Sequence, residues 1–269
     1  MALGRGLKSA VKALVPRGLI YATYEQRLLR QLDRDRLPHH IAVLADGNRR
    51  WARANAPGQE LVVGYRAGAH KLKQFIGWCE EVGIPIVTLW VLSTENLERS
   101  GHGELAPLLD VIRDLVVDLA ADGTRRVQVV GDLNLLPTAI ADDLRAASGS
   151  TETAGGMHVN VAVSYGGRHE LRDAVRSLLA DEATKGTSLA DLADTLEIDH
   201  ISEHLYTAGQ PDPDLIIRTS GEQRLSGFLI WQSAHSEFYF CEALWPDFRK
   251  VDFIRALRSY SQRERRFGH

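Results

Sequence analysis

Polar and charged side chains follow four apolar runs of the 269-residue chain, and their types suit an anion bound together with a divalent cation. The first run is followed by Asp46-Gly-Asn-Arg-Arg-Trp51 and the second by Ser93-Thr-Glu-Asn96, with Arg99 close behind. Two later runs are followed by Ser164-Tyr-Gly-Gly-Arg168 and by Arg218-Thr-Ser-Gly-Glu222. Because open parallel sheets bind ligands at the carboxyl ends of their strands, we expect these segments to form one site.

The segment after the first run contains the residue types that bind phosphate. Gly47 lets the backbone approach a ligand closely, and a helix that starts there offers free N–H groups. Arg49 and Arg50 add bidentate donors, and Asp46 is placed to hold Mg²⁺, which prefers oxygen ligands and usually keeps phosphates in its shell. The alternative is a plain turn with solvated arginines. A G-x-x-x-x-G-K-[ST] loop and a G-x-G-x-x-G fingerprint are both absent, which argues against a nucleotide-binding protein.

Arg218 ends a buried apolar run, where a charge is costly unless it is paired or bound to an anion. The structural interpretation pairs Arg218 with Glu222 or Glu237. The functional interpretation combines it with Arg224 and Ser226 in a second anion pocket and places Glu237 near the metal. Two arginine-rich pockets on one sheet edge predict two phosphorylated substrates that react with each other.

The elements that must position these residues follow from hydrophobic periodicity. Strands are predicted for six short runs: His40–Ala45, Ile86–Leu92, Val127–Val130, His158–Val163, Leu215–Arg218 and Phe228–Gln232. Helices are predicted where apolar residues recur every three or four positions, over 72–82, 105–119 and 171–179. Apolar strands that alternate with helices predict an α/β fold with a central, mostly parallel six-stranded sheet flanked by helices. We expect a single catalytic domain over 37–269, a basic and helical extension over 1–36, and a flexible surface loop over 148–157.

Composition and charge exclude several classes of protein. The longest nearly apolar stretch, Ile84–Leu92, has about half of the ~20 residues of a membrane span, and the start lacks the pattern of a secretory signal. Cys79 and Cys241 lack metal-ligand spacing and indicate reduced thiols in a cytoplasmic protein. The net charge of −3 hides basic ends on an acidic middle, so a continuous positive stripe for nucleic acid is not expected.

The extension permits two interpretations. Apolar residues recur at helical spacing opposite basic ones: Leu3, Leu7, Ala10, Val11, Leu14 and Val15 against Arg5, Lys8 and Lys12. Such a helix is suited to lie on anionic lipid at the inner face of the cell membrane. It is equally suited to pack on the protein or to fray in solution.

Four segments together resemble the cis-prenyltransferases, the undecaprenyl diphosphate synthase-like enzymes. They are His40–Trp51, Ser93–Arg99, Asn160 with Tyr165–Arg168, and Asp214–Ser226. The resemblance runs in order from about His39 to the end of the chain, and it is strongest to the actinobacterial short-chain Z-isoprenyl and (2Z,6E)-farnesyl diphosphate synthases. It implies a prenyltransferase, an enzyme that transfers alkyl groups other than methyl. Such an enzyme uses Mg²⁺ to join isopentenyl diphosphate to an allylic diphosphate, geranyl or farnesyl, with a new Z double bond.

The resemblance also implies a homodimer, a hydrophobic tunnel between sheet and helices, and roles for particular residues. Asp46 and Asn96 would be catalytic, with Asp46 and Glu237 as Mg²⁺ ligands and Asn96 as the proton acceptor or the residue that orients it. Two sets would bind substrate: Gly47, Asn48, Arg49, Arg50 and Trp51 for the allylic diphosphate, and Arg218, Arg224, Leu225 and Ser226 for isopentenyl diphosphate. Ser93, Thr94, Glu95 and Arg99 would line the cleft, and the terminal Arg266-Phe-Gly268 would reach the diphosphate of a partner subunit.

The sequence departs from the family pattern at several positions. A histidine often tied to diphosphate departure is Tyr65, the tryptophan after the Glu-Asn pair is Leu97, and Gln223 and Arg49 replace a histidine and a glycine. Val91 is bulkier than the small residue of long-chain enzymes, which favours short products. The alternatives are a medium- or long-chain polyprenyl diphosphate synthase, a non-catalytic partner subunit and a different phosphate enzyme. The apolar stripe at 105–119 has core packing as its default interpretation and the wall of a substrate tunnel as its alternative.

Overall fold

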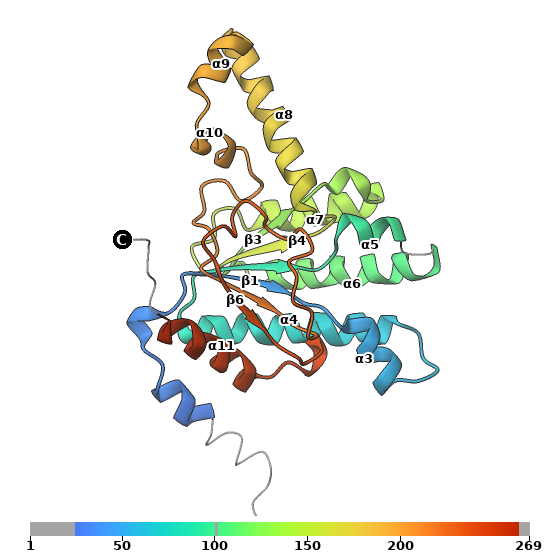
Figure 1. Cartoon of the computed structure of the whole chain (residues 1–269). Coiled ribbons are helices and arrows are strands. Elements are labelled where there is room, and N and C mark those ends of the chain that lie inside the picture. Colours follow the sequence, from blue (N-terminus) through green and yellow to red (C-terminus); the bar gives the residue numbers. More distant parts are fainter. Residues whose placement is uncertain (1–24, 100–101, 264–269) are drawn as a thin grey trace, which may run out of the picture. The chain divides into compact units, whose positions relative to one another are not determined.

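The computed structural model describes residues 25–99 and 102–263 and divides them into two compact units. Residues 38–247 contain the whole sheet and are described first (Figure 1). The second unit comprises residues 25–37 and 248–263; in it Leu28 packs with Val251 and Ile254. The amphipathic pattern of residues 3–15 and the terminal Arg266-Phe-Gly268 lie outside the described residues. No helix in the described ranges is both long and apolar enough to cross a membrane.

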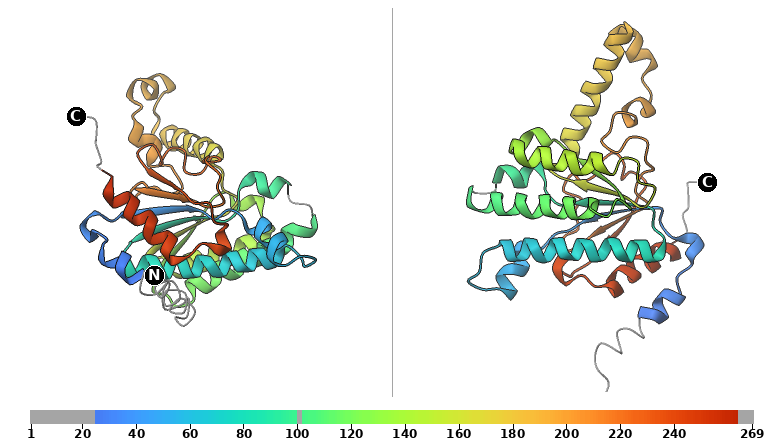
Figure 2. Two further views of the ribbon diagram at one scale, coloured as in Figure 1. Left: turned by 60° about the horizontal axis from the view of Figure 1, so that its bottom comes forward. Right: turned by 180° about the vertical axis from the view of Figure 1, so that it is seen from behind.

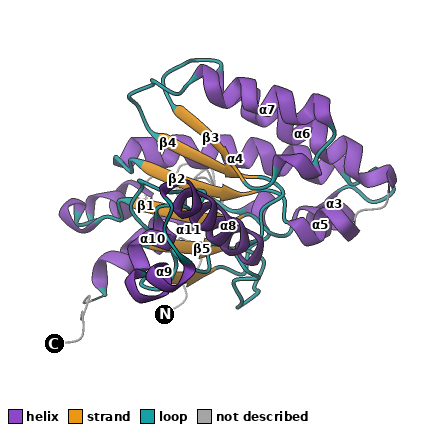
Figure 3. Cartoon of the chain, turned by 90° about the horizontal axis from the view of Figure 1, so that it is seen from above, coloured by secondary structure: helices purple, strands orange, loops and turns teal. Residues whose placement is uncertain are grey.

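The sheet has six parallel strands in the order β3-β4-β2-β1-β5-β6. Figure 3 shows the part of this order from β3 to β5, seen from above. The strands are β1 (His40–Leu44), β2 (Ile86–Trp90), β3 (Arg126–Val130), β4 (His158–Ala162), β5 (Leu215–Arg218) and β6 (Glu237–Phe240). Every residue of β1 and β5 is buried, as expected of parallel strands that are covered on both faces. The predicted α/β fold with its six-stranded parallel sheet is therefore confirmed.

One face of the sheet is covered by α4 (Val62–Val82), α6 (His102–Ala120) and α7 (Thr138–Ser150). Helix α6 packs between α4 and α7 (Figure 2), and the stripe residues Leu109, Ile112 and Val116 are buried. The default interpretation of the 105–119 stripe as core is correct for these residues. The helical patterns at 72–82 and 171–179 also lie in helices, in α4 and in α8 (Gly167–Lys185).

The other face is covered by the segment that leads from α8 to β6. Phe228 and Leu229 pack with Ala42, Leu44 and Ile216 of the strands. Helix α8 and the short helices α9 (Leu189–Thr195) and α10 (Ile198–Ser202) form an arm that extends away from the sheet (Figures 1 and 2). The remaining elements are α3 (Asn48–Asn55), α5 (Thr94–Arg99) and α11 (Lys250–Gln262), with short 3-10 helices at Arg34–Arg36 (η1), Leu133–Leu135 (η2) and Trp245–Asp247 (η3).

Two predictions about elements were wrong. Phe228–Gln232 is a series of turns rather than the sixth strand, because Leu229 has a φ of 45° and its side chain enters the core. The sixth strand is β6, which is only partly buried. Residues 148–157 are not one flexible loop, since α7 continues to Ser150 and the Met157 side chain is buried. The division into an extension over 1–36 and a catalytic domain over 37–269 stays a prediction.

Candidate active site

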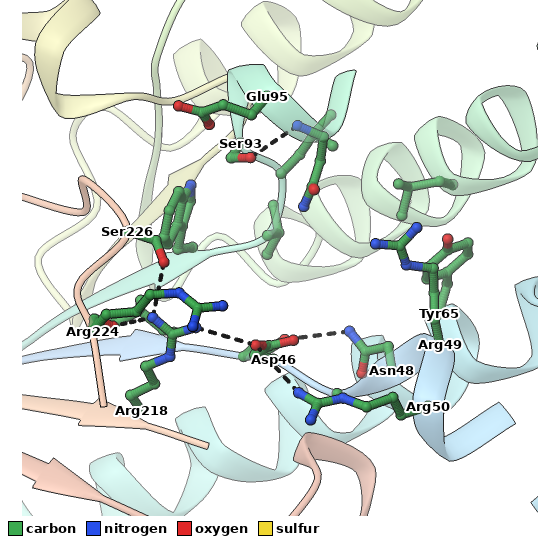
Figure 4. A pocket seen from close by; sticks show the side chains of 18 of the residues that line it. Asp46, Asn48, Arg49, Arg50, Tyr65, Ser93, Glu95, Arg218, Arg224 and Ser226 are labelled. Carbon is green, nitrogen blue, oxygen red and sulfur yellow. Dashed lines mark hydrogen bonds and ion pairs between the residues drawn. The ribbon is translucent and has the colours of Figure 1, made fainter. Parts of the chain in front are cut away.

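A cavity of about 610 Å³ opens at the carboxyl ends of β1, β2 and β5 (Figure 4). Strand β1 lies between the other two, and the chain leaves β1 toward β2 but leaves β5 toward β6. Connections that leave neighbouring strands in opposite directions open a crevice at the sheet edge, which is where ligands bind in α/β folds. The cavity is lined by most of the residues that the sequence predicts for the site: Asp46, Gly47, Asn48, Arg49, Arg50, Ser93, Glu95, Asn96, Arg218, Arg224 and Ser226.

Asp46 is the centre of a polar cluster just beyond β1. Its Oδ2 accepts hydrogen bonds from Ser220 Oγ at 3.0 Å and from Arg218 Nη2 at 3.3 Å. Arg50 Nη2 lies 3.5 Å from the same oxygen. The Thr219 hydroxyl donates to the Asp46 carbonyl at 2.9 Å and accepts from the Asp46 N–H at 3.1 Å. These bonds join the ends of β1 and β5 and hold the carboxylate toward the cavity.

Gly47 starts α3 in a conformation that favours glycine. Its φ is 111°, and a Cβ there would lie 2.9 Å from Leu244 Cδ2 and 3.1 Å from Leu244 Cα. A side chain at this position would therefore be strained and crowded. Glycine here lets α3 begin directly after Asp46, with Arg49 and Arg50 in its first turn.

Arg218 is buried, with 4% of its surface exposed. Its Nη1 donates to Ser226 Oγ at 3.0 Å and to the Arg224 carbonyl. Burial lowers the pKa of the Arg218 guanidinium and Asp46 opposes the shift, so the side chain stays a cation with Asp46 as its partner. The alternative that paired Arg218 with Glu222 or Glu237 is wrong, because Glu222 instead pairs with Arg224.

The end of β2 forms the second wall of the cavity. The Asn96 N–H donates to Ser93 Oγ at 3.0 Å, so Ser93 caps the short helix α5. Glu95 and Asn96 are exposed toward the cavity, whereas the Thr94 side chain is buried and its hydroxyl lies 3.5 Å from His169 Nδ1. The structure thus brings Ser93, Glu95 and Asn96 into the site but not Thr94.

Apolar side chains line the part of the cavity between β2 and α6. They are Leu44, Trp90, Val91, Leu92 and Leu108. The Trp90 ring stacks on Phe228 with centroids 5.1 Å apart, which fixes it against the core. Leu108 is the one stripe residue among the described residues lining this cavity, so an enclosed tunnel along α6 stays a prediction.

Several predicted site residues lie elsewhere. Trp51 Nε1 donates to Asp247 Oδ1 at 2.8 Å, outside the lining, and Leu225 packs against the core cluster that contains Phe228. Glu237 begins β6 and pairs with Leu215, which is the amino end of β5. It therefore lies about 10 Å, measured along the strands, from the level of Arg218. The expectation that Glu237 lies near the metal beside Asp46 does not hold within this chain. The Arg99 side chain lies outside the described part of the chain.

Two lining residues with polar side chains were not predicted as site residues, and Tyr65 was named only as a departure from the family pattern. Arg53 lies one helical turn after Arg49 on α3, and Tyr65 lies on α4. The spacing of Arg49 and Arg53, four residues apart, was the available signal for Arg53.

The comparison with known families decides the assignment. The family model described as undecaprenyl diphosphate synthase (Prenyltransf) matches residues 44–268. The chain belongs to the undecaprenyl diphosphate synthase family. This family comprises the cis-prenyltransferases that the sequence motifs resemble.

Relatives within the family are similar over nearly their whole length. A (2Z,6E)-farnesyl diphosphate synthase of Thermobifida fusca is 57% identical over 249 residues, which cover 93% of this chain and 97% of the relative. A short-chain Z-isoprenyl diphosphate synthase of Mycobacterium bovis is 53% identical, with coverage of 93% and 95%. The solved structure of lavandulyl diphosphate synthase from Lavandula x intermedia in complex with dimethylallyl diphosphate is similar with a TM-score of 0.79 at 33% identity. It covers 87% of this chain and 100% of that chain.

The residues at this site suit a Mg²⁺ ion that is held partly by a protein carboxylate and partly by a bound substrate. Within the described residues no group of three or more His, Cys, Asp or Glu side chains gathers that could hold a metal ion by itself. The Asp46 side chain is 43% exposed, and the hydrogen bonds and ion pairs of its carboxylate with described residues all go to Oδ2 and none to Oδ1. Mg²⁺ is commonly bound by one or two carboxylates together with substrate phosphates, and Asp46 supplies the first part of such a site.

Proposed function

We propose that the protein is a Mg²⁺-dependent cis-prenyltransferase that condenses isopentenyl diphosphate with geranyl or farnesyl diphosphate. The product would be a short-chain Z-isoprenyl diphosphate such as (2Z,6E)-farnesyl diphosphate. The observation that carries the proposal is a single cavity in which arginines and Asp46 adjoin apolar side chains. The names of the relatives support the same reaction.

The charge of the lining favours two anionic substrates. Five arginines line the cavity, namely Arg49, Arg50, Arg53, Arg218 and Arg224, whereas Asp46 and Glu95 are the lining carboxylates among the described residues. The excess of positive charge matches diphosphate groups, whose oxygens suit the forked guanidinium. Asp46 lies between Arg218 and Arg49 in Figure 4, so the arginines form two groups on opposite sides of it. We assign the group of Arg218, Arg224 and Ser226 to isopentenyl diphosphate and the α3 group to the allylic diphosphate.

The residues of the cavity act mainly by electrostatics. The allylic carbon–oxygen bond breaks and its electron pair leaves with the diphosphate, where Arg49 and Arg50 stabilise the growing negative charge. Mg²⁺, when bound beside Asp46, would neutralise part of the same charge. The double-bond electrons of isopentenyl diphosphate form the new carbon–carbon bond, and a proton is then lost to give the Z double bond. Trp90, Val91 and Leu108 exclude water from the reacting carbons.

In this proposal the Asn96 side chain orients the group that accepts the proton. A neutral amide has little basicity, so Asn96 would position isopentenyl diphosphate or a water while a diphosphate oxygen takes the proton. The bond from the Asn96 N–H to Ser93 Oγ holds the start of α5 and thereby the residue.

Assembly and location are further parts of the proposal. We propose a homodimer, because the α8–α10 arm exposes large apolar side chains, with Leu189 77% and Ile198 70% exposed. We place the enzyme in the cytoplasm, with contact between the 1–36 extension and the inner face of the cell membrane. Because Glu237 lies away from Asp46 within this chain, its family role as the second Mg²⁺ ligand would have to be filled across the dimer. This role and the Arg266-Phe-Gly268 tail at a partner subunit's diphosphate are carried over from the family resemblance.

The test is incubation of the purified protein with labelled isopentenyl diphosphate, Mg²⁺ and either geranyl or farnesyl diphosphate. Chromatographic sizing of the extracted products should show addition of one or a few isoprene units. Products of ten or more units would assign the long-chain alternative. An absence of chain growth with every primer would leave the non-catalytic partner subunit, and release of phosphate without a new carbon–carbon bond would indicate a hydrolase.

A further inference from the structure

Trp90 turns one face of its indole ring toward the cavity. Its ring lies parallel to the ring of Phe228, with an interplanar angle of 4° and centroids 5.1 Å apart. Tyr165 is nearly perpendicular to both rings, and its centroid lies 6.3 Å from that of Trp90 and 5.9 Å from that of Phe228. Because these two distances are nearly equal, Tyr165 lies beside the stacked pair and not over the outer face of Trp90. Phe228 is fully buried behind the ring, so the outer face is the surface that Trp90 contributes to the cavity.

The indole N–H of Trp90 carries a cost that a phenyl or aliphatic side chain would not have. Its Nε1 is buried and donates to no acceptor among the described residues. A buried donor without a partner destabilises the folded state. Only the indole, however, supplies the most electron-rich face of the aromatic side chains, which attracts a cation more strongly than a phenyl face does.

The sheet register places Trp90 level with Arg218. Leu44 of β1 pairs with Trp90 of β2 on one side and with Arg218 of β5 on the other. Residues in register on parallel strands point to the same face of a sheet, and all three line the cavity. Two strand spacings, about 10 Å, separate the backbone of Trp90 from that of Arg218. A short chain that is anchored beside Arg218 and extends over Leu44 therefore comes to lie against the Trp90 ring.

We propose that the outer face of Trp90 stabilises the positive charge that develops on the isopentenyl unit during condensation. This inference rests on the proposed function, in which the diphosphate of isopentenyl diphosphate binds beside Arg218. It adds a catalytic residue that touches the reacting carbons, whereas the arginines and Asp46 act on the diphosphates.

The charge on the isopentenyl unit is transient. The electron pair of the broken allylic bond leaves with its diphosphate, and the double-bond electrons of the isopentenyl unit form the new carbon–carbon bond. The branched carbon of that unit thereby becomes electron-deficient. Loss of a proton from the neighbouring carbon gives the new double bond and removes the charge. The indole face attracts the cationic state more strongly than the uncharged substrate, so it lowers the barrier to bond formation.

The direct test compares a cationic and a neutral ligand of the same shape by calorimetric titration of the full-length protein with Mg²⁺. In dimethylaminoethyl diphosphate a protonated nitrogen takes the place of the branched carbon, and isopentyl diphosphate is its uncharged counterpart. Relative to isopentyl diphosphate, Trp90→Leu should weaken binding of the ammonium analogue about 2- to 30-fold, and Trp90→Phe should weaken it less. Trp78→Leu is the matched control, because Trp78 lies on α4 and does not line the cavity; it should leave the ratio of the two affinities unchanged. Equal weakening of both ligands by Trp90→Leu would show that Trp90 only packs, and would overturn the proposal.

A kinetic test keeps the tryptophan side chain and changes only its charge distribution. Fluorine atoms withdraw electrons from the ring face, so protein made with increasingly fluorinated tryptophan should show a stepwise fall in the single-turnover rate of chain growth from geranyl diphosphate. In a Trp90→Phe background the same replacement alters only the other tryptophans and should not change the rate further. Equal sensitivity in both backgrounds, or none in either, would contradict the role of Trp90. This test needs no variant at position 90 other than phenylalanine, so it decides the matter even where Trp90→Leu disturbs folding.

Failure of this inference and failure of the proposed function give different results. An unchanged protein that produces no chain growth with any primer would refute the proposed function, and the titration would still report whether the ring attracts a cation. Chain growth whose rate is indifferent to fluorination would refute the role of Trp90 alone.

Discussion

Replacement of Gly64 by alanine should destabilise the protein although alanine is the better helix former. The new Cβ would lie 2.3 Å from the Asn48 carbonyl oxygen and 2.9 Å from the Ala52 Cβ. The first distance is about 1 Å short of an ordinary contact, and the obstacle is backbone rather than the end of a flexible side chain. Overpacking against rigid backbone costs up to ~3 kcal/mol. Alanine gains about 1 kcal/mol in helix propensity over glycine, so we expect a net loss of about 2 kcal/mol.

Gly77 provides the matched control on the same helix. A Cβ at Gly77 would meet nothing within 4 Å, and its position is exposed. Gly77→Ala should therefore stabilise the protein by about 1 kcal/mol. For a chain of this size about 1 kcal/mol shifts the Tm by ~2–4 °C, so thermal unfolding should show a Tm lowered by ~4–8 °C for Gly64→Ala and raised by ~2–4 °C for Gly77→Ala. Because the displaced α3 carries Arg49, Arg50 and Arg53, Gly64→Ala should also raise the KM of the allylic substrate. Equal shifts of the Tm in the same direction for both variants would refute the close contact of α3 with α4.

Three further predictions concern charge, product length and pH. Asp46→Ala should reduce turnover by a factor of about 10² to 10³ or more, as does the removal of other groups that stabilise charge in a transition state. Far-ultraviolet circular dichroism should show that the fold persists. A normal rate in this variant would show that Asp46 has no part in the mechanism. Val91→Ala removes bulk from the apolar part of the cavity and should lengthen the products seen by chromatography, and unchanged products would show that Val91 does not limit length. Burial lowers the pKa of His40 to about 4, whereas its Nδ1 donates to the Pro211 carbonyl at 2.7 Å and its Nε2 lies 2.8 Å from Thr88 Oγ1. Between pH 6.5 and 4 the unfolded chain binds a proton that the folded chain does not, so the free energy of unfolding should fall with falling pH by ~1.4 kcal/mol per pH unit from this group. Denaturant unfolding at pH 7.5, 6 and 5 should show a smaller slope for His40→Gln, and an undiminished slope would contradict the role of His40.

The sheet was largely predictable because parallel strands covered on both faces appear in the sequence as short apolar runs. This holds for β1 to β5. It fails at Phe228–Gln232, where an apolar run of the same length folds into turns that place Phe228 against Trp90. Length and hydrophobicity do not distinguish these two outcomes, since both bury their side chains. Strand β6 is only partly buried, so its pattern of apolar residues was the weaker signal.

The site was predictable where residues directly follow a strand, because the carboxyl ends of parallel strands share one edge. Asp46, Ser93 and Arg218 meet this condition and lie together. Glu237 does not, since its place depends on the register of β6 with β5, which starts at Leu215. Arg53 and Tyr65 lie further from the strand ends, and their position depends on how α3 packs against α4. Local sequence patterns do not contain that packing, although the four-residue spacing of Arg49 and Arg53 indicates that these two side chains share a face of α3.

A crystal structure with Mg²⁺, isopentenyl diphosphate and an unreactive geranyl thiolodiphosphate tests the central claim most directly. Both diphosphates should lie in the cavity at the carboxyl ends of β1, β2 and β5, one beside Arg218 and Arg224 and the other beside Arg49 and Arg53. The geranyl chain should extend past Val91 and Leu108. Diphosphates bound away from these arginines, or a prenyl chain excluded from the apolar part of the cavity, would contradict the account.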